Sequence, residues 1–197
     1  MKHPESAKST TGRTATSEEY LLAVTVGERE PLNGTISLVP YDPGWTAQFS
    51  LQADRIREAL AEKVLRLEHV GSTAVPGLSA KPVIDMVLTV SNSADESSYV
   101  PPLEKHGFVL RIREPDWFEH RLLKAPDIDG NLHVFSIGCE EIDRMIAFRD
   151  WLRMHDEDRR RYEATKRELA ARTWRHVQNY ADAKSEIVRE ILARALG

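Results

Sequence analysis

The chain has 197 residues, of which 41% are hydrophobic and 29% are charged, and its formal net charge is −4. This length fits one domain with an ordinary core, and the acidic balance gives the whole molecule no electrostatic reason to bind nucleic acid. No apolar run approaches the roughly 20 residues that cross a bilayer. The single cysteine, Cys139, leaves no internal disulfide, as in a reducing compartment. We therefore expect a cytoplasmic protein with neither a membrane nor a nucleic-acid partner.

The first 35 residues are expected to form a flexible extension, and residues 36–197 the folded domain. Residues 1–19 are rich in Ser, Thr, Lys and Glu and contain almost no large apolar side chains. They cannot bury enough surface to offset the entropy lost on ordering. Residues 20–26 are apolar enough for a short strand or helix.

Hydrophobic periodicity predicts the next elements in chain order. A helix is predicted over 45–62, because five apolar residues recur there at helical spacing: Trp45, Phe49, Ala53, Ile56 and Leu60. Residues 64–70 alternate apolar and polar side chains, which is typical of a half-buried strand. A loop of small residues follows over 71–81. Residues 83–90 are then nearly all apolar and predict a central strand covered on both faces.

The second half of the chain contains strands followed by helices. A helix over 98–106 precedes three predicted strands, over 108–113, 118–125 and 132–137. Residues 140–196 contain no proline or glycine and predict two or three helices, with breaks near His155 and Thr173. Strands first and helices last indicate an α+β fold, with a mixed sheet and a C-terminal helical bundle.

The loop after residue 70 carries the first candidate site. Glycines let a backbone approach a ligand closely, and Gly71, Ser72 and Thr73 could cradle an anion while Lys81 supplies a positive charge. Asp85 stands in the apolar strand that follows, where an unpaired carboxylate is costly to bury. It therefore needs Lys81, a metal ion or a hydrogen-bond donor. A solvent-facing turn and a purely structural Asp85–Lys81 pair are the alternatives.

The loop at 71–81, with several other motifs along the chain, is similar in sequence to a known protein family. The chain resembles the GrpB family, small bacterial proteins with the nucleotidyltransferase superfamily fold related to DNA polymerase β. The resemblance covers about residues 36–196. It is carried by HVGSTAVPGL at 69–78, KPVID at 81–85, VPYDPGW at 39–45, NLHV at 131–134 and FRDWLR at 148–153, with Tyr162, Lys166, Tyr180 and Lys184.

The resemblance also implies a metal site, which this sequence matches only in part. Active nucleotidyltransferases hold two divalent cations on three acids. Here Asp85 is the first acid, Val87 occupies the second position, and His133 stands where the third is expected. Magnesium prefers oxygen ligands, so Asp85, His69 and His133 could instead hold one zinc or manganese ion. In the alternative interpretation both histidines hydrogen-bond to loop backbone. His133 could also act as a general base.

The C-terminal helices carry three pairs of residues at a spacing of four, which places each pair on one helix face. The pairs are Arg149 with Arg153, Tyr162 with Lys166, and Tyr180 with Lys184. Together they could grip an anionic ligand. Surface ion pairing with nearby acids is the alternative, and it is the preferred interpretation for the run 159–161.

These residues favour an enzyme that acts on a nucleotide or another phosphorylated or carboxylated small molecule. The loop at 71–73 would cradle the anion, Lys81, Arg149 and Arg153 would neutralise it, and Asp85 with His133 would carry metal or proton chemistry. Magnesium, manganese and zinc are the candidate cofactors. Two other functions stay open. One is a non-catalytic anion-binding module, which Val87 favours, and the other is a regulatory partner in nucleotide metabolism.

Overall fold

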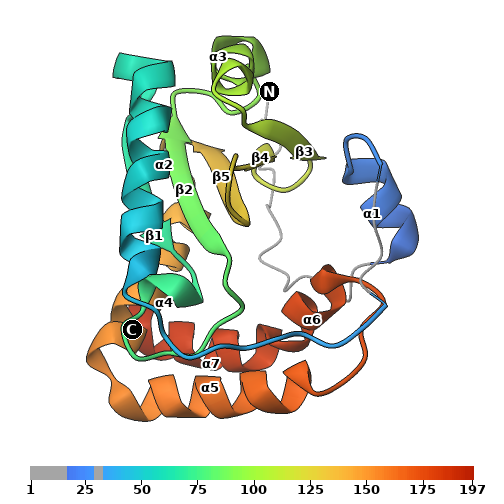
Figure 1. The fold of residues 1–197 in the computed structure, drawn as a ribbon, viewed down its shortest axis with the longest axis vertical. Helices are drawn as coiled ribbons and strands as arrows, with labels where there is room; N and C mark the ends of the chain where they lie inside the picture. Colours follow the sequence, from blue (N-terminus) through green and yellow to red (C-terminus); the bar gives the residue numbers. More distant parts are fainter. Residues whose placement is uncertain (1–16, 29–32) are drawn as a thin grey trace, which may run out of the picture.

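The structure, a computed structural model, describes residues 17–28 and 33–197. Its centre is a five-stranded mixed sheet with the strand order β1-β2-β5-β4-β3 (Figure 1). Strands β2 and β5 are parallel, and every other neighbouring pair is antiparallel. The expected α+β class and mixed sheet are confirmed. The strands are β1 (Arg66–Val70), β2 (Ile84–Val90), β3 (Val109–Glu114), β4 (His120–Lys124) and β5 (Gly130–Ser136).

One face of the sheet is covered by α2 (Gly44–Leu60) and α3 (Val100–Lys105). Because successive side chains of a strand point to opposite faces, Ile84, Met86 and Leu88 of β2 share this core with Ile56 and Leu103. All five are essentially excluded from solvent. The helix α2, the strand β2 and the interior position of β2 in the sheet agree with the periodicity of the sequence.

The opposite face of the sheet contacts α4 (Glu140–Met154), with Val87, Phe135 and Ile142 in a second apolar cluster. The chain continues into α5 (Asp156–Ala170), α6 (Val177–Ala183) and α7 (Ser185–Leu196), which form the lower layer in Figure 1. The region therefore holds four helices rather than two or three. The breaks near His155 and Thr173 are confirmed. The additional break falls at Lys184, where neither glycine nor proline marks it.

The loop at 71–81 is packed against these helices. Val75 and Leu78 are fully buried in a cluster with Leu152 of α4, Tyr162 of α5 and Ile191 of α7. The loop contains one short 3-10 turn, Ser72–Ala74. Two further 3-10 turns lie at Ala61–Lys63 and Glu96–Ser98. The alternative of a solvent-facing turn is wrong, because the apolar residues of this loop are buried between the sheet and the bundle.

Regular structure begins before residue 36. The helix α1 (Glu18–Val24) lies next to β3, and Thr25 forms an antiparallel bridge with Ile112 (Figure 1). The short strand or helix expected over 20–26 is therefore a helix. The flexible tail expected over 1–19 falls mostly on residues outside the described part of the chain. No helix in the described part is both long and apolar enough to span a membrane.

Candidate functional site

Asp85 is the second residue of β2, at the end of the strand next to the loop. Asn131, its register partner on β5, donates a hydrogen bond of 2.8 Å from Nδ2 to Asp85 Oδ1. His133 Nε2 lies 3.8 Å from the same oxygen. Burial opposes ionisation of Asp85, but His133, Asn131 and the charge of Lys184 outweigh it and hold its pKa below its usual range. Asp85 is therefore an anion at neutral pH.

Gly71 lets the loop pass directly over this carboxylate. Its φ is +71°, in the left-handed region that favours glycine. A Cβ atom added to Gly71 would lie 2.6 Å from Asp85 Oδ2, closer than any real contact. Glycine is needed here both for the backbone conformation and for the approach to Asp85.

We expect Gly71→Ala to lower the free energy of unfolding by about 1–3 kcal/mol, since a non-glycine residue at this φ is strained and the new methyl group displaces Asp85. Urea unfolding would measure the loss. Gly77→Ala is the matched control, because Gly77 has a similar φ of +78° but nothing within 4 Å of its added Cβ. Equal losses in the two variants would show that the contact with Asp85 adds nothing.

Lys166 of α5 reaches into the same region from below. Its Nζ donates to Ser72 Oγ at 3.2 Å and to the carbonyl oxygen of Ser79, and its side chain is 2% exposed. Burial, together with the nearby charge of Lys184, lowers the pKa of Lys166 to about 7. Both of these acceptors are uncharged, and a buried ammonium held by uncharged acceptors is suited to receive an anionic ligand.

Lys184 and two tyrosines complete this group. Lys184 lies at the break between α6 and α7, with Nζ 4.5 Å from the ring centroid of Tyr180. Burial lowers the pKa of Lys184, although Tyr180 and Asp85 partly offset this effect. Burial also raises the pKa of Tyr162 to about 12, so its hydroxyl stays protonated. The structure thus brings five of the candidate residues close together: Ser72, Asp85, Tyr162, Lys166 and Lys184.

Thr73 and His69 instead stabilise the base of the loop. Thr73 Oγ1 donates to the carbonyl oxygen of Val83 at 2.9 Å and lies 3.0 Å from His69 Nε2. Because the hydroxyl proton is used on Val83, His69 Nε2 must be the donor to Thr73. The imidazole stacks on Phe49 of α2 with 4.9 Å between ring centroids. Burial lowers the pKa of His69 to about 4, so the ring is neutral at pH 7.

The metal set Asp85, His69 and His133 does not converge. His69 faces α2, whereas Asp85 and His133 lie on the opposite face of the sheet. Among the described residues, no group of three or more His, Cys, Asp or Glu side chains could hold a metal ion. Val87 stands at the position of the second acid and is fully buried in the apolar cluster with Phe135. The donors present do not fit the two-cation site of nucleotidyltransferases.

The other predicted cations make protein contacts of their own. Lys81 lies 3.7 Å from Asp129 and is half-exposed. Arg149 is 7% exposed and donates to Glu68 Oε2 and to the carbonyl oxygen of His69, both at 2.8 Å. Arg153 Nε donates to the carbonyl oxygen of Ala74 at 3.0 Å. Both arginines thus join α4 to β1 and the loop, and their contacts account for them without a ligand.

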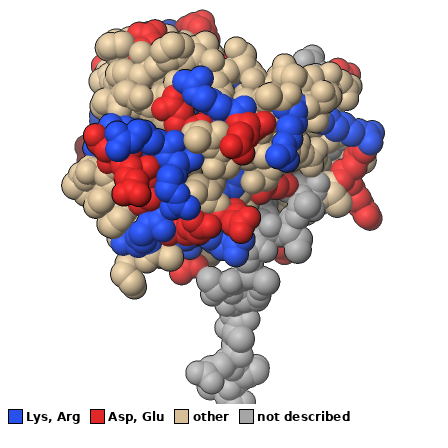
Figure 2. Space-filling view, turned by 90° about the horizontal axis from the view of Figure 1, so that it is seen from below, with Lys and Arg blue, Asp and Glu red and all other residues tan. Residues whose placement is uncertain are grey.

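The basic run at 159–161 lies on a surface of mixed charge. Arg159 pairs with Asp156 at 2.8 Å, and Arg161 pairs with Glu190 of α7 at 2.9 Å. Figure 2 shows basic and acidic side chains interspersed over the face seen from below. Surface ion pairing, the preferred interpretation of this run, agrees with these contacts.

Two residues beside His133 were not predicted from the sequence. His120 Nε2 lies 3.0 Å from His133 Nδ1, and His120 Nδ1 lies 2.6 Å from Glu114 Oε2. Both residues are 3% exposed. The pattern of the sequence places His120 on a strand and Glu114 near the end of another. The strand pairing that brings them to His133 cannot be read from that pattern.

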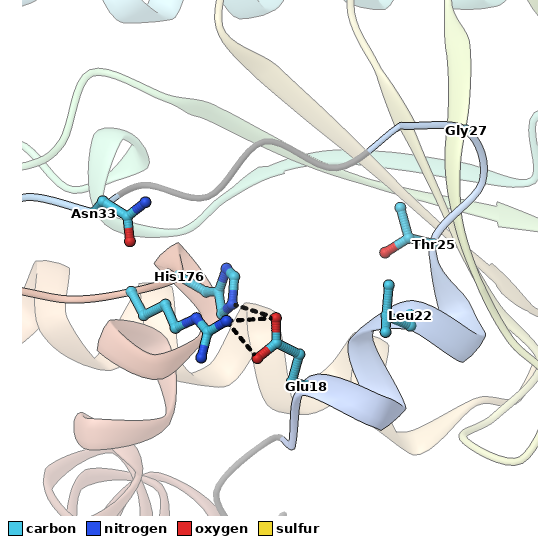
Figure 3. A pocket seen from close by; sticks show the side chains of 7 residues that line it. Glu18, Leu22, Thr25, Gly27, Asn33 and His176 are labelled. Carbon is cyan, nitrogen blue, oxygen red and sulfur yellow. Dashed lines mark hydrogen bonds and ion pairs between the residues drawn. The ribbon is translucent and has the colours of Figure 1, made fainter.

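A cavity of about 570 Å³ lies apart from this site, between α1 and the start of α6 (Figure 3). Glu18 lines it and pairs with Arg175 at 2.8 Å, while His176 Nε2 lies 3.9 Å from the same carboxylate. None of the predicted site residues lines this cavity.

The fold and the site together define an α+β protein with a nucleotidyltransferase-like mixed sheet and a polar group of residues between the sheet and the helical bundle. A family model described as GrpB protein matches residues 35–194. The chain therefore belongs to the GrpB family.

Individual relatives agree with this assignment. The chain is 58% identical over 188 residues to UPF0157 protein BH1888 of Halalkalibacterium halodurans, an alignment that covers 95% of this chain and 96% of that protein. A solved structure, of the conserved protein GrpB from Enterococcus faecalis, superposes with a TM-score of 0.70 at 28% identity and covers 82% of this chain and 100% of that one. A longer relative is the dephospho-CoA kinase of Mycolicibacterium paratuberculosis, 29% identical over 195 residues. That match covers 85% of this chain but 47% of the kinase.

Proposed function

We propose that this protein is an enzyme that acts on a small anionic substrate, phosphorylated or carboxylated, of which a nucleotide is one form. The observation that carries the proposal is the pair formed by the buried Lys166 and the half-buried Lys184, which lies with the hydroxyl of Ser72 beside the ionised Asp85. Buried cations are rare in proteins unless a partner compensates them. An anionic ligand between the two lysines would be that partner.

Each residue has a role that follows from its chemistry. Lys166, Lys184 and Ser72 bind the anion, because ammonium and hydroxyl groups donate hydrogen bonds to phosphate or carboxylate oxygens. Asp85 and His133 lie at the edge of the same region and can accept or donate a proton. Asn131 holds Asp85 through its amide. The chemistry rests on these side chains, since the carboxylates present do not fit a two-cation site.

A non-catalytic anion-binding module is the second candidate. Val87 favours it, because this fully buried valine replaces the acid that nucleotidyl transfer requires. Both candidates use the same lysines and differ in whether the bound molecule is converted. A regulatory role, in which the C-terminal helices α4 to α7 bind another protein, has less support. The exposed large apolar residues of these helices, Met154, Val177 and Leu196, are scattered rather than forming a stripe.

The test is calorimetry of the purified protein with inorganic pyrophosphate, ATP and citrate, each alone and with magnesium, manganese or zinc. We expect at least one of these anions to bind without a metal. We expect Lys184→Gln and Lys166→Gln each to weaken that binding by about 10- to 100-fold, the range for losing a charged hydrogen bond. Lys81→Gln is the matched control and should change the affinity by less than about twofold, because Lys81 pairs with Asp129 away from the site.

Three results would contradict the proposal. One is the absence of binding by any of these anions, and another is an equal loss of affinity in Lys81→Gln. The third is binding that requires magnesium or manganese and disappears in Asp85→Asn, which would restore metal-dependent nucleotidyl transfer. Phosphorus NMR of the protein incubated with ATP then separates the two candidates. A new phosphorus signal that is lost in Asp85→Asn supports an enzyme, and bound but unchanged ATP supports the binding module.

A further inference from the structure

Four titratable residues form a continuous row across one face of the sheet. They stand on four neighbouring strands: Glu114 on β3, His120 on β4, His133 on β5 and Asp85 on β2. Glu114 pairs with His120 in register, and His133 is the register partner of both Leu122 and Val87. Because alternate residues of a strand share a face, His120 lies on the same side as Leu122, and Asp85 on the same side as Val87.

The distances along this row allow contact at each step. They are 2.6 Å from Glu114 Oε2 to His120 Nδ1, 3.0 Å from His120 Nε2 to His133 Nδ1, and 3.8 Å from His133 Nε2 to Asp85 Oδ1. Exposure rises in the same direction. The side chains of Glu114 and His120 are 3% and 4% exposed, whereas those of His133 and Asp85 are 18% and 30% exposed. The row therefore has a buried end at Glu114 and an open end at Asp85.

The buried end is held rigidly. The ring of Phe135 stacks on His120 with 4.8 Å between centroids, and Trp117 meets it edge-on at 5.1 Å. The hydroxyl of Tyr20 in α1 donates to Glu114 Oε1 at 2.5 Å. These contacts fix the plane of the His120 ring and leave its two nitrogens directed at Glu114 and His133.

The positions of the hydrogens follow from the acceptors. The hydrogen bond that Glu114 accepts from the Tyr20 hydroxyl favours its ionised form, which only accepts, so His120 carries its hydrogen on Nδ1, which faces Glu114. A neutral His120 then has a lone pair on Nε2 and must accept the hydrogen bond from His133 Nδ1. Neutral His133 consequently carries its hydrogen on Nδ1, and its Nε2, 3.8 Å from Asp85 Oδ1, acquires a hydrogen that faces Asp85 only when the ring is protonated. The hydrogen bond made by one ring nitrogen sets the state of the other.

We infer that Glu114 and His120 are positioning residues, which keep His133 Nε2 available as the proton acceptor of the site. After His133 has accepted a proton, they also take up the resulting positive charge, on the His120 ring. A proton from the substrate binds His133 Nε2, and the proton on His133 Nδ1 passes to His120 Nε2. His133 is then neutral, with its hydrogen on Nε2, and His120 is an imidazolium beside the Glu114 carboxylate. The reverse transfers return the proton. The catalytic meaning of this relay rests on the proposed function, but the state of the His133 ring does not.

Another acidic group also acts on His133. Glu141 of α4 lies close enough to interact electrostatically with His133 and pairs with Arg144 at 3.0 Å. Burial raises the pKa of Glu141, while the charges of Arg144 and His133 partly offset this effect. His120 and Asp85 each lie within 4 Å of a ring nitrogen of His133.

The test is NMR of the ligand-free protein labelled with ¹⁵N in its histidines, at a pH where His133 is neutral. Two-bond correlations identify which ring nitrogen carries the hydrogen. We expect the Nδ1–H form of His133 to exceed the Nε2–H form by about tenfold, as one hydrogen bond to a fixed acceptor allows. In Glu114→Gln the ratio should fall to within about threefold of unity, because an amide can present either an acceptor or a donor to His120.

Glu119→Gln is the matched control. It removes a carboxylate from the residue next to His120, but Glu119 contacts Arg121 and not the relay. The wild-type ratio should persist in this control. His120→Phe is the second variant, since a phenyl ring suits the contacts with Trp117 and Phe135, and it should also bring the His133 ratio close to unity.

Two results would overturn the inference: a predominantly Nε2–H form of His133 in the wild-type protein, or an unchanged ratio in folded Glu114→Gln and His120→Phe. Because no ligand is present, either result is independent of anion binding. A fixed Nδ1–H form together with failed calorimetry would refute the proposed function and leave the positioning of His133 standing.

Discussion

Pyrophosphate affinity is expected to fall by up to about tenfold for each pH unit above pH 7, beyond the change caused by the titration of the anion itself. The reason is the pKa of Lys166, which burial and the nearby Lys184 lower to about 7. Above that pH the free protein has lost the ammonium, whereas a bound anion favours it. Binding must then take up a proton, and each pH unit costs about 1.4 kcal/mol. Below pH 7 the lysine is already charged and adds no slope.

Calorimetry at pH 6, 7, 8 and 9 measures this dependence. Lys166→Gln supplies the slope that belongs to pyrophosphate alone, because it has no titrating amine at this position. Two buffers with different ionisation enthalpies report the proton uptake directly. If wild type and Lys166→Gln show the same slope, Lys166 does not contact the anion in its charged form.

Arg149→Met is expected to lower the free energy of unfolding by about 3 kcal/mol. The guanidinium is 7% exposed and donates to Glu68, to the carbonyl oxygen of His69 and to Asp150. Methionine fills much of the same space but leaves these acceptors without their donor, and breaking a buried ion pair costs about 3–5 kcal/mol. The lower end applies here because Glu68 and Asp150 keep partial contact with water.

Urea unfolding gives this loss, with Arg153→Met as the matched control one turn further along α4. The side chain of Arg153 is 39% exposed, so its removal should cost about 1 kcal/mol or less. If Arg149→Met were as stable as wild type but no longer bound the anion, Arg149 would be a ligand-binding residue, as the sequence suggested.

The fold followed from the sequence because its patterns are local. The nearly unbroken apolar run of β2 predicted a buried central strand, and the spacing of Trp45 and Ile56 predicted α2. The break at Lys184 had no such signal. Lys184 stands between α6 and α7 with φ −86° and ψ −7°, in the helical region, so no turn residue marks the division.

The candidate site was predictable where the resemblance to the GrpB family supplied the residues. Ser72, Asp85, Lys166 and Lys184 come from distant parts of the chain, and only family motifs linked them. The possible metal set grouped His69 with Asp85, but His69 pairs with Met86, the neighbour of Asp85 on β2, and therefore points to the opposite face of the sheet. His120 was missed for a related reason. In the connection between β3 and β4, Phe118 and Glu119 have positive φ, a backbone conformation that their residue types do not predict.

The segment after α1 has a consequence for how the protein behaves among its own copies. β3 is the last strand of the sheet, and the N–H of Val26 donates to the carbonyl oxygen of Arg111 at 2.8 Å while Thr25 bridges Ile112. An outer strand with free N–H and C=O groups is a template on which another chain can add its own strand. Residues 25 and 26, which precede the family match, occupy part of that template. By covering this part of β3, they hinder edge-to-edge aggregation of the sheet. We expect a chain shortened to the matched region to lose this protection.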